Sequence, residues 1–201
     1  MTTEYRALIE KVETHTRSAH ERRRADMACT AGCSGCCQVW LSVGPVEAAE
    51  LRAGLAELPT AQRVRVAERG RQEQAREAGE TSAQNAPRCA MLEPEGQCAV
   101  YAHRPLVCRT QGYALRYPPG FVPEAAVRTR TSTGDVTHCP LNFTQAPPRA
   151  EDVLDAERVD QILAVVGQRF ALAHGQDPSQ RFAISALAAE AMLSPAGKPL
   201  P

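Results

Sequence analysis

The chain has 201 residues, of which 43% are hydrophobic and 4% aromatic, and its 23 basic side chains balance its 23 acidic ones. This length fits one domain of ordinary size. The balanced charge disfavours nucleic acid or an anionic membrane as partners, because proteins that bind them carry a basic excess. The sequence has no apolar run long enough to span a membrane, and its first residues lack the apolar core of a signal peptide. We therefore expect a cytoplasmic protein.

The N-terminal segment is predicted to form an amphipathic helix over residues 3–26. Its charged end at residues 21–26 is expected to be solvated. The apolar face is formed at helical spacing by Tyr5, Leu8, Ile9, Val12 and Ala19.

A cysteine-rich loop comes next. Gly32 and Gly35 allow tight, left-handed turns there, so the backbone of this loop can wrap around a metal. Four thiols lie within nine residues, at Cys29, Cys33, Cys36 and Cys37. The other four cysteines of the chain are Cys89, Cys98, Cys108 and Cys139.

Two helices are predicted after this loop. Pro45 stands at the first position of one helix, which Pro59 ends, and leucines form its apolar face. Thr60 is expected to cap a second, highly charged helix that runs to about residue 78. Residues 79–149 lose helical periodicity and are rich in Pro and Gly. We expect them to be irregular and tied together by a metal.

The C-terminal part is predicted to be a helical pair over residues 151–193. Asp177 followed by Pro178 is expected to begin its second helix. Residues 194–201 are expected to form a disordered tail.

These elements predict a mainly α fold. Helices flank an irregular Cys-rich metal-binding core at residues 29–139, and residues 1–193 form a single metal-binding domain.

Three interpretations of the eight thiols compete. A disulfide framework is disfavoured because the chain has no export signal. Cys33 and Cys36 have the spacing of a zinc knuckle, but the later cysteines do not repeat it, so a Zn²⁺ site would draw on three or four of the eight. An iron–sulfur cluster accepts widely spaced cysteines from a wrapping loop. We favour the cluster, of the 4Fe–4S type, and keep zinc as the alternative.

Basic side chains accompany the later cysteines. Arg104 and Arg109 bracket Cys108. A centre held by four thiolates is net negative, so guanidinium groups nearby would offset its charge. The alternative is that these arginines only solvate a loop. His103 and His138 also stand near cysteines, although a single loop histidine is more often a polar loop residue than a ligand.

The spacing of three cysteines indicates a second class of function, that of an enzyme. Cys29, Cys33 and Cys36 match the radical S-adenosylmethionine signature, in which three thiolates leave one iron open for that cofactor. The rest of the chain does not alternate strands and helices as the barrel of those enzymes does. An enzyme that modifies a protein or a small molecule is therefore the alternative to a metal-binding or redox module. The sequence names no protein or small-molecule partner.

The cysteine pattern as a whole resembles a known family. It consists of Cys29-Thr-Ala-Gly-Cys-Ser-Gly-Cys-Cys37, Glu47 in a helix, and a segment from Arg88 to Arg109 that contains Tyr101-x2-Arg104-Pro105-x2-Cys108. These residues look like the YkgJ family of bacterial cysteine-cluster proteins, also called the CxxCxxCC family or zinc- or iron-chelating domain. Flagellin lysine N-methylases are similar in this region.

The resemblance implies a metal centre and residues that support it. Pro105 biases Arg104 away from helix, which makes Tyr101 and Arg104 candidates, beside Arg109, for orienting the thiolates. The alternative for Tyr101 is that it simply packs. The methylases imply an iron–sulfur cluster and S-adenosylmethionine. The implied ligands are a combination of Cys33, Cys36, Cys37, Cys89, Cys98 and Cys108, with Cys29 and Cys139 as further candidates.

Overall fold

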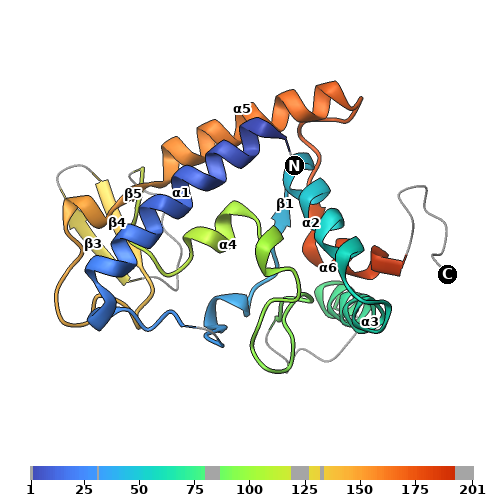
Figure 1. Ribbon diagram of the computed structural model, residues 1–201, viewed down its shortest axis with the longest axis horizontal. Helices are drawn as coiled ribbons and strands as arrows, with labels where there is room; N and C mark the ends of the chain where they lie inside the picture. Colours follow the sequence, from blue (N-terminus) through green and yellow to red (C-terminus); the bar gives the residue numbers. More distant parts are fainter. Residues whose placement is uncertain (1, 31, 80–86, 119–126, 132–133, 193–201) are drawn as a thin grey trace. The chain divides into compact units, whose positions relative to one another are not determined.

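Figure 1 shows the computed structural model of the chain, which describes residues 2–30, 32–79, 87–118, 127–131 and 134–192. Helices dominate these residues, which confirms the predicted mainly α class. The α-helices are α1 (Thr3–Arg22), α2 (Pro45–Glu57), α3 (Thr60–Glu77), α4 (Leu106–Thr110), α5 (Ala156–Ala173) and α6 (Ile184–Ala189). Short 3-10 helices are η1 (Arg24–Asp26), η2 (Gly35–Cys37), η3 (Tyr101–His103), η4 (Ala150–Asp152) and η5 (Glu190–Met192).

None of the helices in the described ranges is both long enough and apolar enough to cross a membrane.

The described residues divide into two compact units. Those of the first unit lie within Ala31–Pro105 and Gly167–Pro201, and those of the second within Thr2–Thr30 and Leu106–Val166. The single metal-binding domain expected from the sequence stays a prediction. The tail expected after residue 193 lies outside the described residues.

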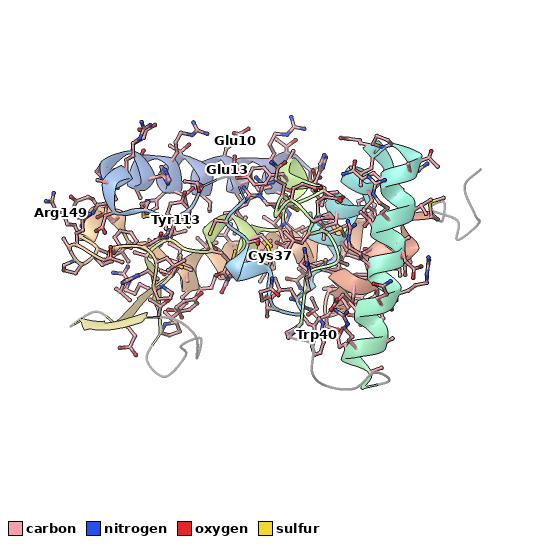
Figure 2. All side chains as sticks on the ribbon, turned by 90° about the horizontal axis from the view of Figure 1, so that it is seen from below. Glu10, Glu13, Cys37, Trp40, Tyr113 and Arg149 are labelled. Carbon is pink, nitrogen blue, oxygen red and sulfur yellow. The ribbon has the colours of Figure 1, made fainter. Side chains whose placement is uncertain are left out.

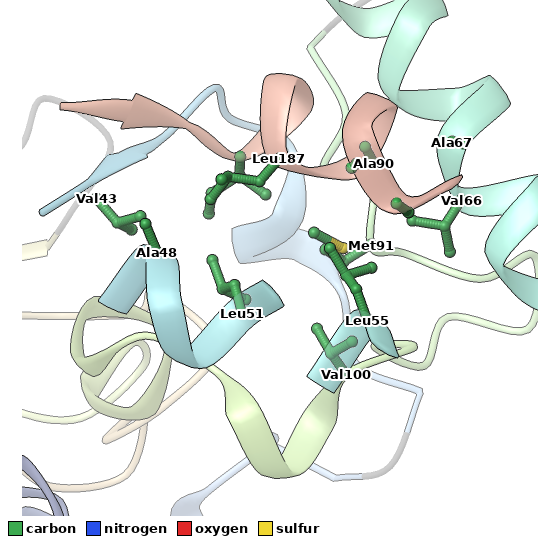
Figure 3. Packing of buried hydrophobic residues seen from close by; sticks show 13 residues of the cluster. Val43, Ala48, Leu51, Leu55, Val66, Ala67, Ala90, Met91, Val100 and Leu187 are labelled. Carbon is green, nitrogen blue, oxygen red and sulfur yellow. The ribbon is translucent and has the colours of Figure 1, made fainter. Parts of the chain in front are cut away.

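The core of the first unit is built from α2, α3, α6 and the segment around Met91 (Figure 3). Leu51 and Leu55 of α2 are buried, as the predicted apolar face requires, and Leu58 packs against the same cluster. The fully enclosed members of the cluster include Val43, Leu51, Val66, Met91 and Leu187.

A two-stranded sheet precedes α6 in this unit. β1 (Ser42–Val43) pairs antiparallel with β6 (Phe182–Ala183), and the amide of Ile184 donates to the Leu41 carbonyl at 2.9 Å. The helix predicted to begin at Asp177 therefore begins only at Ile184, and that prediction is wrong. The Asp177 carboxylate instead accepts from the amide and hydroxyl of Ser179, which closes a local turn.

The α3 and α6 helices approach each other at Gly70 of α3. A Cβ built on Gly70 would lie 2.3 Å from the amide nitrogen of Ala189 and 2.7 Å from the carbonyl oxygen of Ser185. Both neighbours are backbone atoms, which cannot swing aside. Glycine at this position is therefore a packing requirement, although it lowers the intrinsic helix propensity of α3.

We expect Gly70→Ala to lower the free energy of unfolding by about 1–3 kcal/mol, because the added methyl overpacks the α3–α6 contact. Gly167→Ala on α5 is the matched control, since its Cβ would meet only a Val46 methyl at 3.9 Å. That variant should be neutral or gain up to about 1 kcal/mol from helix propensity. Urea unfolding measures the change in the free energy of unfolding for both variants. An equal change in the two would contradict the close packing at Gly70.

The second unit combines α1 with a small sheet. The predicted apolar face of α1 is confirmed, because Tyr5, Leu8, Ile9, Val12 and Ala19 are all buried. The sheet has the order β3-β4-β2-β5, with an antiparallel β3-β4-β2 part and a parallel β2–β5 pair. Its strands are β2 (Leu115–Tyr117), β3 (Val127–Thr131), β4 (Gly134–His138) and β5 (Leu154–Asp155).

This sheet corrects the expectation of irregular structure over residues 79–149. Its strands are two to five residues long, so each is too short to show a clear alternation of apolar and polar positions.

The charged end of the N-terminal helix is also different from the prediction. Asp26 is buried rather than solvated, and its carboxylate accepts from the Thr144 hydroxyl at 3.0 Å and the Gln145 amide at 2.9 Å. Arg22 and Arg23 donate to the buried carboxylate of Asp152 at 3.0 and 2.7 Å. This run of charges therefore holds distant segments of the second unit together.

Candidate metal centre

Two cysteine-bearing segments of the first unit are joined by backbone contacts. Cys36 and Cys37 lie on η2, and the amide of Cys89 donates to the Cys37 carbonyl at 2.8 Å. Gly32 and Gly96 both have positive φ, and a Cβ on Gly96 would lie 2.8 Å from the Gly32 carbonyl oxygen. Glycine at this contact lets the cysteine loop touch the turn that follows Cys89.

That turn brings a fourth cysteine back toward Cys89. Leu92 and Cys98 form an antiparallel bridge, and the amide of Ala99 donates to the Met91 carbonyl at 2.8 Å. Cys89 and Cys98 therefore stand at the two ends of one tight hairpin-like turn.

The loop itself differs in one detail from the prediction. Gly32 is left-handed as expected, with φ at +89°, whereas Gly35 begins η2 without a positive φ. Cys33 and Cys36 are exposed, and Cys37 is half-buried.

The thiols of this unit oppose one another's ionisation. The side-chain hydrogen bond between the Cys36 and Cys37 thiols, with burial second, raises the pKa of Cys36 well above its ordinary value. Burial raises the pKa of Cys89 to about 11, and the Cys98 and Cys36 thiols add to this rise. Burial also raises the pKa of Cys98. Without a cation these groups therefore hold their protons, and a bound metal would displace them.

Arg104 is the cation that acts on the thiols of the first unit. It lowers the pKa of Cys36 and of Cys98, against the larger effects that raise both. Its Nε donates to the Tyr101 carbonyl at 3.0 Å, and its guanidinium carbon lies 3.5 Å from the centre of the Tyr101 ring. Tyr101 is 62% exposed, so it supports Arg104 rather than packing in the core. The role of both residues toward a metal stays a prediction.

The donor set fits a soft metal, because thiolates favour zinc, Cu(I) and iron–sulfur clusters. Among the described residues, however, no three His, Cys, Asp or Glu side chains are already arranged to hold an ion. A metal must therefore draw the thiols together as it replaces their protons, which couples binding to local folding.

The second unit carries Cys29, Cys108 and Cys139. Cys108 lies on α4, and Arg109 beside it is buried and pairs with the carboxylate of Glu13. Glu13 lies on α1 (Figure 2). This ion pair gives Arg109 a structural role within the unit, and its predicted role toward a metal stays a prediction.

The two histidines near cysteines are engaged elsewhere. The Nδ1 of His103 bonds to Glu50 at 2.8 Å and its Nε2 to Glu57 at 3.1 Å. The Nδ1 of His138 bonds to the Cys139 carbonyl at 2.9 Å, and its ring packs edge-on to Phe143. Both rings therefore bond to protein groups, but His138 is buried at the end of β4, so the interpretation of it as a polar loop residue is wrong.

A group of charged and aromatic residues beside Cys89 was not predicted from the sequence. Glu73 of α3 is buried, accepts from Trp40 and from the Arg88 amide, both at 3.2 Å, and pairs with Arg76 at 2.6 Å. A small hollow of about 10 Å³ is lined in part by Trp40, Arg88 and Cys89. Glu73 stands in a helix full of charges, so no sequence signal separated it from its exposed neighbours.

These thiols and the fold around them define the class of the protein, which is a cysteine-rich chelating domain. The sequence profile of the CxxCxxCC family, described as a "putative zinc- or iron-chelating domain", matches residues 28–136. The chain belongs to this family, and metal chelation by its cysteines is its shared property. No curated protein and no solved structure matches the chain significantly. The similarity to flagellin lysine N-methylases stays a prediction from the cysteine pattern.

The raised pKa of Cys89 predicts how the metal-free protein responds to alkali. An unfolded thiol ionises near pH 9.0, whereas the folded Cys89 thiol ionises near 11. Stability is therefore full below pH 9 and falls as the pH rises toward 11, by on the order of 2–3 kcal/mol. Urea unfolding of metal-free protein at several pH values should show this fall. Cys89→Ala should reduce this fall and leave the part due to Cys36 and Cys98, and an equal slope in both proteins would contradict the burial of the Cys89 thiol.

The contacts of His103 predict that it is not a ligand. His103→Ala should lower stability, because Glu50 and Glu57 lose their shared partner, but it should leave the metal content unchanged. Cys98→Ala should lower metal affinity by more than the roughly 10–100-fold that loss of a supporting partner costs. Metal analysis and competition with a chelator compare the two. A loss of metal in His103→Ala but not in Cys98→Ala would show that His103, rather than Cys98, is the ligand.

Proposed function

We propose that the first unit holds an iron–sulfur cluster of the 4Fe–4S type and that the protein acts as a metal-binding or redox module. The observation that carries this proposal is the electrostatic coupling of Cys36, Cys37, Cys89 and Cys98. Four thiols are the number that one cluster takes from a protein. They come from two segments about fifty residues apart that backbone contacts hold together.

The adjacency of Cys36 and Cys37 favours a cluster over a single zinc ion. Adjacent side chains converge on one small ion only with difficulty, because a structural zinc site demands tetrahedral geometry around one atom. A cluster presents several iron corners, so adjacent thiolates can reach different ones. Zinc bound by the same thiols is the alternative metal.

Arg104 supports a centre of negative net charge. A cluster or a zinc ion with four thiolate ligands is net negative, and Arg104 already lowers the pKa of two of the proposed ligands. The Arg104 guanidinium packs over the ring of Tyr101. We therefore assign Arg104 to tuning the charge of the centre, and Tyr101 to holding Arg104.

A module is favoured over an enzyme that uses S-adenosylmethionine. Four thiolate ligands leave no iron open for that cofactor. The hollow beside Cys89, at about 10 Å³, is also far smaller than the roughly 300–1,000 Å³ of typical ligand pockets. On this proposal the protein works in the cytoplasm, where thiols stay reduced.

The test is the composition of protein purified without oxygen. We expect brown protein that contains iron and acid-labile sulfide, with the visible absorption of cysteine-ligated clusters. Cys89→Ala should lose iron and sulfide together. Cys33→Ala is the matched control, since Cys33 is exposed like Cys36 but lies outside the four proposed ligands. Colourless wild-type protein with about one zinc and no sulfide would overturn the cluster.

A change in the electron paramagnetic resonance signal of the reduced protein on addition of S-adenosylmethionine would overturn the module and favour the enzyme.

A further inference from the structure

The second unit gathers two cysteines that the proposed cluster does not use. Cys29 and Cys139 are 110 residues apart in the sequence and are both half-buried. Both approach Gly112. A Cβ built on Gly112 would lie 2.7 Å from the Cys29 sulfur and 3.9 Å from the Cys139 Cβ. Both side chains therefore lie beside residue 112, and the Cys29 sulfur can approach its backbone this closely because residue 112 has no side chain.

One buried amide holds this arrangement. The side chain of Asn142 is 1% exposed, and its Oδ1 accepts from the Ala28 amide at 2.8 Å. Its Nδ2 donates to the Gly112 carbonyl at 2.7 Å and to the Cys29 sulfur at 3.2 Å. An N–H directed at sulfur stabilises the thiolate, which is the nucleophile in thiol–disulfide exchange.

The segment that carries Cys139 is fixed to the segment that carries Cys29. The amide of Asn142 donates to the Cys139 carbonyl at 3.0 Å, which forms a turn. The amide of Phe143 donates to the Asp26 carbonyl at 2.8 Å, and the Asp26 carboxylate binds the next residues. The approach of the two cysteines is thus built into the fold of the second unit.

We propose that Cys29 and Cys139 form a reversible disulfide site, separate from the metal centre. The oxidant is a small disulfide such as oxidised glutathione. The Cys29 thiolate attacks one of its sulfurs, and one glutathione thiolate leaves. The Cys139 thiolate then attacks the Cys29 sulfur of the mixed disulfide, and the second glutathione leaves. Two protein thiols lose two electrons and two protons, and the small disulfide becomes two thiols.

The proposal suits a reducing compartment, because cytosolic disulfides are typically transient and redox-sensing. A disulfide needs only two thiols, whereas a tetrahedral metal site needs four ligands, of which this pair supplies two.

The test treats metal-loaded protein with oxidised glutathione without oxygen, followed by alkylation, digestion and mass spectrometry. We expect the peptides of Cys29 and Cys139 to be linked, with two hydrogens fewer, and dithiothreitol to release them. Cys29→Ser and Cys139→Ser should form no link and should keep the full metal content. Alkylation of both wild-type thiols, a link to any other cysteine, or metal loss in Cys29→Ser would overturn the proposal.

Asn142→Asp tests the role of the amide. It keeps the size of the side chain and an acceptor for the Ala28 amide, but loses the N–H donor to Cys29 and to the Gly112 carbonyl and adds a negative charge beside the sulfur. Both changes disfavour the Cys29 thiolate, so the link should form at least about fivefold more slowly, while the melting temperature serves as a check on folding. An unchanged rate in a folded variant would remove Asn142 from the proposal. Because metal content is measured in parallel, failure of this site and failure of the proposed cluster give different results.

Discussion

The resistance of neighbouring thiols to ionisation is the constraint on which the first unit depends. The Cys37 thiol raises the pKa of Cys36, and burial raises the pKa of Cys89 and Cys98, so their thiolates are disfavoured without a cation. The backbone bond from Cys89 to Cys37 and the glycine contact beside it keep them together all the same. A fold that enforces such an arrangement gains stability when a metal replaces the protons.

Carboxylates on the charged helices of this unit form hydrogen bonds with residues close to the cysteines. Glu73 of α3 binds Trp40 and the Arg88 amide, which flank Cys37 and Cys89 in the sequence. Glu50 and Glu57 of α2 hold His103 at the end of η3, and η3 is followed at once by Arg104. Carboxylates on two helices therefore position both the thiols and the cation that faces them.

Elements with a strong local signal could be predicted from the sequence, whereas those made by distant contacts could not. The apolar stripe of the N-terminal helix and the proline start of α2 have short-range patterns and are confirmed. The late start of α6 depends on pairing with Ser42 and Val43, far away in the chain. The cysteine spacing identified the family, but the roles of Asn142 and Glu73 follow only from the partners that folding brings to them.

The most direct test of the central claim is X-ray absorption spectroscopy of the metal-loaded protein at the edge of the bound metal. The account predicts iron surrounded by sulfur, with short iron–iron scattering, and loss of both signals in Cys89→Ala. Zinc with a single shell of sulfur at about 2.3 Å, or a metal bound mainly through nitrogen and oxygen, would contradict it.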